Sequence, residues 1–394
     1  MAASMRHNFI KPIIPMSCMY AHNMHFRNKS SNANSTNEMK NPKENASHYF
    51  HPRKNQKYKK VQGSSIGKSN LLQSYPGVRQ LDEITGDHVN ELVDSKSAAG
   101  IEKTQTIFLE GEKIIRQAVK AGIHFKSVYT TEVKLLEKLE LGEAQQYITK
   151  VKALKSWVSQ KAVESDGIIC AVAQKPDPSV SETENRLPVT VVMDRITDPW
   201  TAGVLLRTAH GVGCRRFVTT KGCCNMWDSE VLTASDGSHF YMPIQTNLSW
   251  NVLKQNGEAE EYTRRKVIFT SARPMTFQAI LKAEEKFLTD NLEDEDTDAL
   301  DNDSSPTSLS KSAEKSGFQL THFNEVDLSN SDDFTLIISD DTLKVSNQKI
   351  KFLHENDAVL ASVPMTSGMT KLNPTVPGIL MLYHLLGQLT SNKV

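Results

Sequence analysis

Short apolar runs alternate with stretches of helical periodicity in the middle of the chain. Thr106–Leu109 is a run of β-branched and aromatic residues that is typical of a strand, and apolar residues then recur at helical spacing over 114–119. Similar patterns predict strands at 128–130, 147–150 and 167–172, and a second helix marked by Leu135, Leu136 and Leu139. This alternation predicts a small α/β domain over residues 101–176.

A second alternation begins at Leu187. The run 189–194 is continuously apolar and ends in an acid, which is typical of a parallel strand buried on both faces. A helix is predicted at 204–212, further strands at 216–219, 267–270, 336–338 and 359–363, and a closing helix at 379–389. Strands that alternate with helices predict a mostly parallel sheet covered on both faces. We therefore expect an α/β domain over 187–392.

Charge is distributed unevenly along the 394 residues, although the formal net charge is zero. Residues 1–40 are basic and rich in Ser and Asn, which predicts a mitochondrial transit peptide; a basic tail that contacts RNA phosphates is the alternative. Residues 41–100 read as a basic, largely disordered linker, in which 51–60 is either an RNA-contacting arm or a solvated stretch. Acidic residues dominate about 284–333, which predicts a disordered surface insert.

Several classes of protein are excluded or disfavoured by the motifs that the chain lacks. The five cysteines show no CxxC spacing, and His210, His239 and His354 do not have metal-ligand spacing, so no metal site is expected. Arg216 occupies the third glycine position of a would-be dinucleotide fingerprint, and no GxxxxGK[ST] occurs. No apolar run approaches the ~20 residues of a membrane span.

Three segments follow predicted strands and should meet at one edge of the sheet, where ligands bind in open parallel sheets. The first, 194–213, contains Asp198-Pro199, Thr201, Gly203 and Arg207-Thr208-Ala209. The second, 338–346, reads ISDDTLKVS. The third, 363–375, contains Val363-Pro364-Met365 and Lys371-Leu372-Asn373.

These segments resemble the three motifs of the SpoU (TrmH-like) family of RNA 2′-O-methyltransferases, over roughly 187–389, and Phe108–Gly111 resembles the family's smaller RNA-binding domain. The resemblance implies a SPOUT fold, a parallel sheet with a trefoil knot that general rules would disfavour. It also implies a homodimer that holds S-adenosylmethionine in the knot and acts on ribosomal RNA. The transit-like head and the acidic insert are similar to those of a mitochondrial member that methylates a guanosine of the large-subunit RNA.

Site residues follow from the resemblance by position. Arg207 and Thr201 are the implied catalytic residues, with Thr201 at a position where the family has Asn. An Arg side chain stays protonated at neutral pH, so Arg207 is better suited to clamp a phosphate and stabilise a developing alkoxide than to act as a base. The implied cofactor-binding residues, which act largely through backbone atoms, are Ser339, Val363, Leu372 and Asn373.

The cofactor segments depart from the family pattern. Ser339, Thr342 and Lys344 replace glycines, Asp341 stands for Glu, Lys371 stands for Ser, and Pro374 removes a backbone donor. Two hypotheses therefore remain. The first is an active ribosomal RNA 2′-O-methyltransferase, and the second is a catalytically impaired relative that binds ribosomal RNA as a mitochondrial ribosome assembly factor.

Overall fold

The computed structural model describes residues 77–137, 139–177, 186–259, 264–290, 297–298, 317–340 and 344–391. All of them lie in one unit of the chain, Ser65–Val394. The expected transit peptide at 1–40 and most of the expected linker lie outside the described residues. Among the described residues, no helix combines the length and apolar character that crossing a membrane requires.

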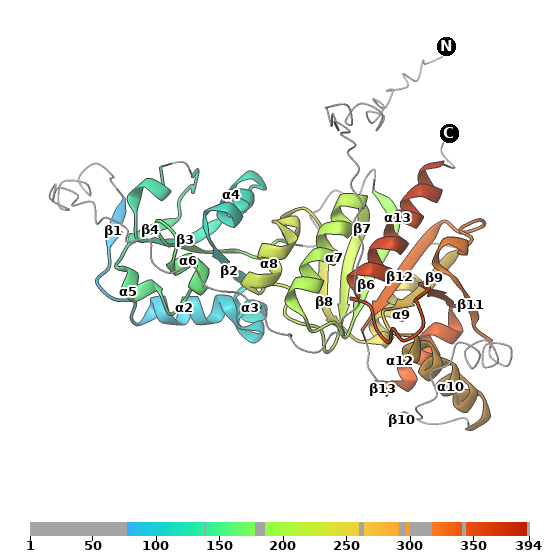
Figure 1. The fold of residues 1–394 in the computed structure, drawn as a ribbon. Helices are drawn as coiled ribbons and strands as arrows, with labels where there is room; N and C mark the ends of the chain where they lie inside the picture. The colour runs from blue at the N-terminus through green and yellow to red at the C-terminus, as the bar shows by residue number, and fades with distance from the viewer. Residues whose placement is uncertain are drawn as a thin grey trace, which may run out of the picture. The chain divides into compact units, whose positions relative to one another are not determined.

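A mixed sheet of order β1-β4-β3-β5-β2 forms the smaller domain (Figure 1). Its strands are β1 (Val78–Gln80), β2 (Thr106–Glu110), β3 (Phe125–Thr130), β4 (Gln145–Ile148) and β5 (Ile169–Gln174). Its main helices are α2 (Asp87–Lys96), α3 (Ala98–Thr104) and α4 (Glu112–Lys120), with short turns α5 (Val151–Leu154) and α6 (Gln160–Val163). Strands β1, β3 and β4 run parallel, whereas β5 pairs antiparallel with both β2 and β3.

The smaller domain begins earlier than the sequence pattern predicts. Strand β1 pairs with β4, and α2 packs on the sheet because Leu92 is fully buried in a cluster with Phe108 and Tyr129. Residues 77–100 are therefore part of this domain and not of a disordered linker. The prediction of a second helix near Leu135 was also wrong, because only the 3-10 turn η2 (Val133–Leu135) forms there.

The larger domain contains a sheet of seven parallel strands in the order β11-β14-β9-β12-β6-β7-β8. The strands are β6 (Leu187–Asp194), β7 (Cys214–Thr220), β8 (Ile244–Leu248), β9 (Arg265–Ser271), β11 (Gln319–His322), β12 (Asp333–Ser339) and β14 (Val359–Ser362). The helices are α7 (Pro199–Val212), α8 (Ser229–Ser235), α9 (Trp250–Ala259), α10 (Pro274–Asp290), α12 (Asn347–Glu355) and α13 (Thr375–Ser391). The predicted α/β fold with a parallel sheet is confirmed.

Both faces of this sheet are covered, because successive residues of a strand point to opposite sides. Val191 of β6 and Leu336 of β12 belong to a cluster that includes side chains of α7 and α13. Their neighbours Val192 and Ile337 belong to a second cluster that includes side chains of α9, α10 and α12. The central strands are therefore buried on both faces and mostly apolar, as the sequence pattern predicted.

The acidic insert is narrower than predicted. Helix α10 continues to Asp290, and Glu284, the expected first residue of the insert, is buried with its carboxylate 3.1 Å from Nδ1 of His354. On the other side, β11 pairs with β14, and Val326 and Leu328 are buried. Of the remaining residues 291–316, the structure describes only β10 (Thr297–Asp298), which pairs with β13 (Lys344–Val345).

The segment after β14 crosses the carboxyl edge of the sheet before α13 begins. The amide of Leu372 donates to the carbonyl of Ala272, beyond β9, at 2.9 Å. Helix α13 then packs on α7 so closely that a Cβ on Gly378 would lie 2.7 Å from Cδ2 of Leu205. Asp198–Arg207 and Lys371–Thr375 thus meet at the same edge, and this route agrees with the knotted topology that the resemblance implies.

Candidate active site

Helix α7 presents the residues of the first motif, and its sequence fixes where it begins. The Asp198 carboxylate caps the helix by accepting from the amide of Thr201 at 2.7 Å, and Pro199 occupies the first turn. Gly203 lets α7 approach α8, because a Cβ there would lie 2.4 Å from Cβ of Ala234. The motif residues Asp198, Pro199 and Gly203 thus build the helix that carries Arg207.

The two implied catalytic residues differ in exposure. The Thr201 side chain is buried near the start of α7, whereas the Arg207 side chain is 59 % exposed. Nη2 of Arg207 lies 3.3 Å from Oδ2 of Asp236, whose other oxygen lies 2.7 Å from Nζ of Lys113 in the smaller domain. The structure therefore places Arg207, and not Thr201, where its side chain can reach a ligand.

Asp236 was missed by the sequence analysis. It ends α8 in the left-handed conformation, with φ 52°, which aspartate tolerates better than most residues. The hydrogen bond from Lys113 and the charge of Arg207 hold the pKa of Asp236 below its ordinary value. The only sequence signal was an acid directly before Gly237, which indicates a turn and says nothing about Arg207.

The implied cofactor residues all lie at the carboxyl edge, but their side chains face different ways. Ser339 is fully buried at the end of β12, Val363 and Leu372 are half-buried, and Asn373 is exposed. The Asn373 side chain accepts from the amide and hydroxyl of Thr375, at 2.9 and 2.8 Å, and so fixes the start of α13. The side chains of Ser339 and Asn373 thus have structural partners within the chain.

Asp340 joins the loops that follow three neighbouring strands. Its carboxylate lies 3.2 Å from Nε of Arg273, after β9, and 3.0 Å from Nζ of Lys371, after β14. Asp340 itself follows β12. Lys371, which stands where the family has Ser, therefore has an acidic partner in the second segment. Asp341 and Thr342, which also differ from the family pattern, lie outside the described residues.

A buried polar cluster is centred on Asp194, at the carboxyl end of β6. The Asp194 carboxylate accepts from Nζ of Lys349 at 2.7 Å and from the hydroxyls of Ser339 and Thr220 at 2.8 Å each. Burial by itself raises the pKa of Asp194, but the Lys349 charge and these hydrogen bonds outweigh burial and keep the pKa low. Sequence analysis had treated Asp194 as a strand end and had not identified Lys349.

His239 is buried between two hydrogen-bond partners. Nε2 lies 2.6 Å from the carbonyl oxygen of Met226, and Nδ1 lies 2.7 Å from Oγ of Ser235. Burial lowers the pKa of His239 to about 4, so the ring is neutral at physiological pH. No group of three or more His, Cys, Asp or Glu side chains is placed to bind a metal ion within the parts of the chain that are described.

The fold matches solved structures of SpoU-type methyltransferases. A structure of an rRNA methyltransferase from Sinorhizobium meliloti with AdoMet covers 79 % of this chain and 99 % of its own, with TM-score 0.54 and 15 % identity. The SpoU methyltransferase AviRb from Streptomyces viridochromogenes, also with AdoMet, covers 78 % and 99 %, with TM-score 0.53 and 15 % identity. At this identity the likeness establishes the fold, which is that of the SpoU methyltransferases.

Sequence similarity points to particular proteins with this fold. The chain is 31 % identical over 188 residues to mouse mitochondrial rRNA methyltransferase 3, which is 46 % of this chain and 43 % of the relative. The human protein of that name is 32 % identical over 188 residues, 46 % and 42 % of the two chains. The Bacillus subtilis 23S rRNA (guanosine(2553)-2′-O)-methyltransferase RlmP is 27 % identical over 143 residues, 36 % and 54 %.

The matched region spans less than half the length of the mouse and human relatives. No protein-family model matches the chain. The resemblance read from the motifs, to SpoU methyltransferases and within them to mitochondrial rRNA methyltransferase 3, is confirmed by these similarities in fold and sequence.

Proposed function

We propose that this chain methylates the 2′-hydroxyl of a guanosine in mitochondrial large-subunit ribosomal RNA, with S-adenosylmethionine as the methyl donor. The observation that carries the proposal is the packing of α13, which directly follows residues 371–374 at the carboxyl edge of the sheet, against α7, which bears Arg207. The substrate and compartment are suggested by the names of the similar proteins.

The residues at this edge fit the chemistry of the methyl donor. S-adenosylmethionine, when bound, supplies an electrophilic methyl group on a sulfonium. Arg273 and Lys371 are cations suited to its carboxylate, and Asp340 holds these two cations side by side. Backbone atoms of Ser339, Val363 and Leu372 would surround it, although the Leu372 amide is already bonded to Ala272.

Arg207 would serve as a fixed positive charge. Its neighbour Asp236 is an anion that holds the guanidinium in place, and an arginine side chain is not deprotonated in proteins, which disfavours a role as base. A protonated Arg207 would grip the phosphate beside the target ribose and stabilise negative charge as the 2′-hydroxyl loses its proton. The buried Thr201 would act by positioning the start of α7 and not by touching RNA.

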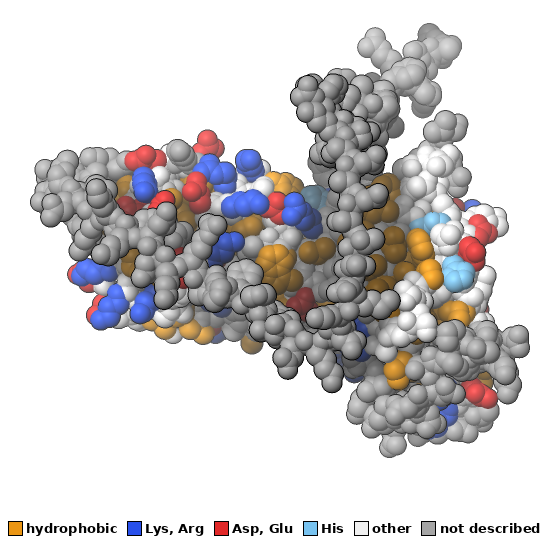
Figure 2. Space-filling model, viewed as in Figure 1, with side chains coloured by type: hydrophobic (Ala, Val, Ile, Leu, Met, Phe, Trp, Pro, Cys, Tyr) orange, Lys and Arg blue, Asp and Glu red, His pale blue; other side chains and the backbone are white. Residues whose placement is uncertain are grey.

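RNA and a second copy of the chain are the proposed partners. On the face drawn in Figure 2, Lys and Arg side chains gather over α4, which carries Lys113, Arg116 and Lys120. Such a patch can neutralise phosphates. Trp200 on α7 and Tyr383 on α13, two helices that pack together, are large exposed side chains of the kind that a homodimer surface covers. In that dimer Arg207 would act on RNA held by the partner's cofactor pocket.

A second function is favoured by one observation at the cofactor loops. The carboxylate of Asp340 already pairs with Arg273 and Lys371, and the Leu372 amide already has a backbone partner. The described parts of these loops are therefore held by contacts within the chain. Such loops suit a relative that binds ribosomal RNA as an assembly factor of the large ribosomal subunit without transferring a methyl group.

Mapping ribose methylation on mitochondrial ribosomal RNA tests the proposal. Cells that lack this chain should lose methylation at one guanosine of the large-subunit RNA, and the wild-type chain should restore it. The Arg207→Ala variant, expressed at the same level, should not restore it. If every ribose methylation persists in the absence of the chain while the large subunit fails to assemble, the assembly-factor function is the correct one.

A further inference from the structure

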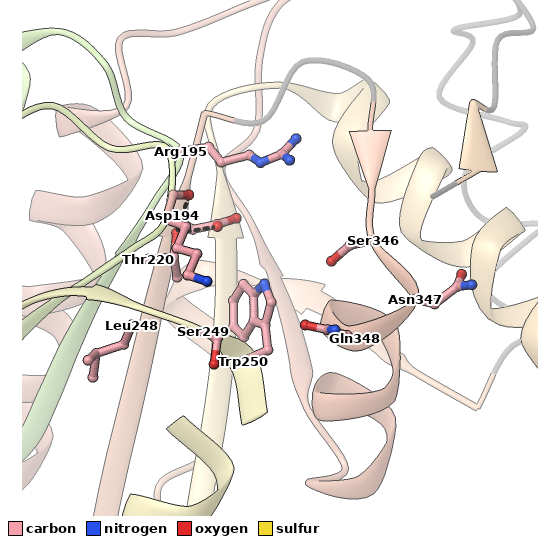
Figure 3. A pocket seen from close by; sticks show the side chains of 10 residues that line it. Asp194, Arg195, Thr220, Leu248, Ser249, Trp250, Ser346, Asn347 and Gln348 are labelled. Carbon is pink, nitrogen blue, oxygen red and sulfur yellow. Dashed lines mark hydrogen bonds between the residues drawn. The ribbon is translucent and has the colours of Figure 1, made fainter. Parts of the chain in front are cut away.

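A cavity of about 340 Å³ opens at the carboxyl ends of β6, β7 and β8 (Figure 3). It lies between the loops after β6 and β7 on one side and the start of α12 on the other. Helices α9 and α12, which flank it, cover the face of the sheet opposite to α7 and α13. Its volume falls in the range of small-ligand pockets, about 300–1,000 Å³. The proposed methyl-transfer site includes none of its lining residues.

The loops at the mouth of the cavity contribute two cations. Arg195 directly follows β6, and Lys221 directly follows β7. Arg195 has φ 52°, a left-handed conformation that costs free energy in a residue other than glycine. Asp194, the acid of the lining, does not offset these charges, because its carboxylate is already neutralised by Lys349. Among the described residues that line the cavity, the cations Arg195 and Lys221 thus outnumber the one acid.

The opposite wall adds backbone donors and an aromatic surface. Ser346 caps the nine-residue helix α12, whose first turn, Asn347 and Gln348, lines the cavity. The amide groups and the dipole of a first helical turn favour an anion. Trp250 lies across the cavity from these residues in Figure 3; its indole packs on Phe352 of α12, is largely buried, and forms the aromatic part of the lining. Cations, helix amides and an indole together suit a ligand with both a phosphate and a planar base.

We propose that this cavity binds a nucleotide, with its phosphate between Arg195, Lys221 and the start of α12 and its base against Trp250. The same chemistry has two sources, a free nucleotide or a nucleotide within an RNA chain. The RNA source rests on the proposed function, because the cavity would then hold a nucleotide outside the methylated position. In either case it is a binding site separate from the methyl-transfer site.

The test is calorimetric titration of the full chain, without S-adenosylmethionine, with guanosine 5′-monophosphate, guanosine, inorganic phosphate and a five-nucleotide RNA. The monophosphate should bind more tightly than either guanosine or phosphate, because it alone fills both halves of the cavity. Tighter binding of the RNA than of the monophosphate identifies the RNA source, and equal or weaker binding identifies the free nucleotide.

Two variants locate the binding. Lys221→Ala and Arg195→Asn, the latter keeping a residue that tolerates positive φ, should each weaken monophosphate binding about tenfold, the size expected for one charge-assisted contact. Lys351→Ala, which removes an exposed cation of α12 outside the cavity, should leave it unchanged. Monophosphate binding that is undetectable at millimolar concentration, or that is equal in the wild type and both cavity variants, would overturn the proposal.

Failure of this site and failure of the proposed function are distinguishable. The titrations need neither the cofactor nor turnover, so a chain that lacks methyltransferase activity can still show the nucleotide site. If the chain is an active methyltransferase and the RNA source holds, Lys221→Ala should raise the KM for RNA and leave the affinity for S-adenosylmethionine unchanged. Far-ultraviolet circular dichroism of each variant confirms that the fold is retained.

Discussion

The guanidinium of Arg207 lies 3.3 Å from the carboxylate of Asp236, and the same carboxylate binds Lys113 of the smaller domain. Asp236 thus links the residue implied in catalysis to the domain implied in RNA binding. Because Arg207 is largely exposed, its ion pair with Asp236 contributes little to the free energy of unfolding. The contact instead restrains the position of the guanidinium.

Arg207→Ala should abolish methyl transfer and leave RNA affinity mostly intact, because the side chain acts on charge that develops during the reaction.

Asp236→Asn should lower kcat about tenfold with little change in KM, because Asn keeps the left-handed backbone but releases Arg207. Steady-state kinetics on substrate RNA measures both. The control is Lys113→Ala, which removes the other cation that contacts Asp236 and leaves the pair of Asp236 with Arg207 in place. Unchanged methylation by the Arg207 variant would remove Arg207 from the mechanism.

Lys349→Met should destabilise the chain by about 3–5 kcal/mol, because it leaves Asp194 as an unpaired charge in the core. Adding Asp194→Asn should recover part of the loss. The matched control is Arg264→Met, which breaks the exposed pair with Asp332 and should cost no more than about 1 kcal/mol. Urea unfolding measures all three variants. Equal losses for the buried and exposed pairs would show that Asp194 and Lys349 are not a buried ion pair.

The free energy of unfolding should fall as the pH drops from about 6.5 to 4. Burial holds the pKa of His239 at about 4 in the folded chain, below its ordinary value of 6.5, so the unfolded state binds more protons in this window. The predicted contribution is up to about 3 kcal/mol. Urea unfolding across this range should show a weaker pH dependence for His239→Gln, whereas His322→Gln, at an exposed site, should retain the wild-type slope.

Asp340→Asn should weaken S-adenosylmethionine binding by no more than about fivefold. The variant loses two partly exposed ion pairs, to Arg273 and Lys371, each worth about 0–1 kcal/mol. Calorimetric titration measures the change. A loss of a hundredfold or more would mean that Asp340 contacts the cofactor directly, and tighter binding would mean that the ion pairs close the pocket against it.

The larger sheet could be predicted from sequence because its strands are buried on both faces. Runs such as 189–193 are almost entirely apolar, and that pattern has few other interpretations. Strand β1 and helix α2 escaped prediction because α2 is mostly polar and joins the core chiefly through Leu92. Glu284 was assigned to the acidic insert because its burial depends on a contact with His354, 70 positions away.

The candidate site was predictable only as far as the motifs extend. The motif placed Arg207, Ser339, Val363, Leu372 and Asn373 at one edge of the sheet. It could not reveal that Asp236 holds Arg207 or that Lys349 neutralises Asp194, because these partners meet only through tertiary packing. It also implied a catalytic role for Thr201, and it could not reveal that this side chain is buried.

Titration of the purified chain with S-adenosylmethionine tests the central claim most directly, because an eroded cofactor pocket is what separates an enzyme from an RNA-binding relative. Binding with Kd in the micromolar range, about −8 kcal/mol, is the predicted result. No detectable heat or fluorescence change at millimolar cofactor would contradict the account and leave a SpoU-type fold that serves ribosomal RNA without methylating it.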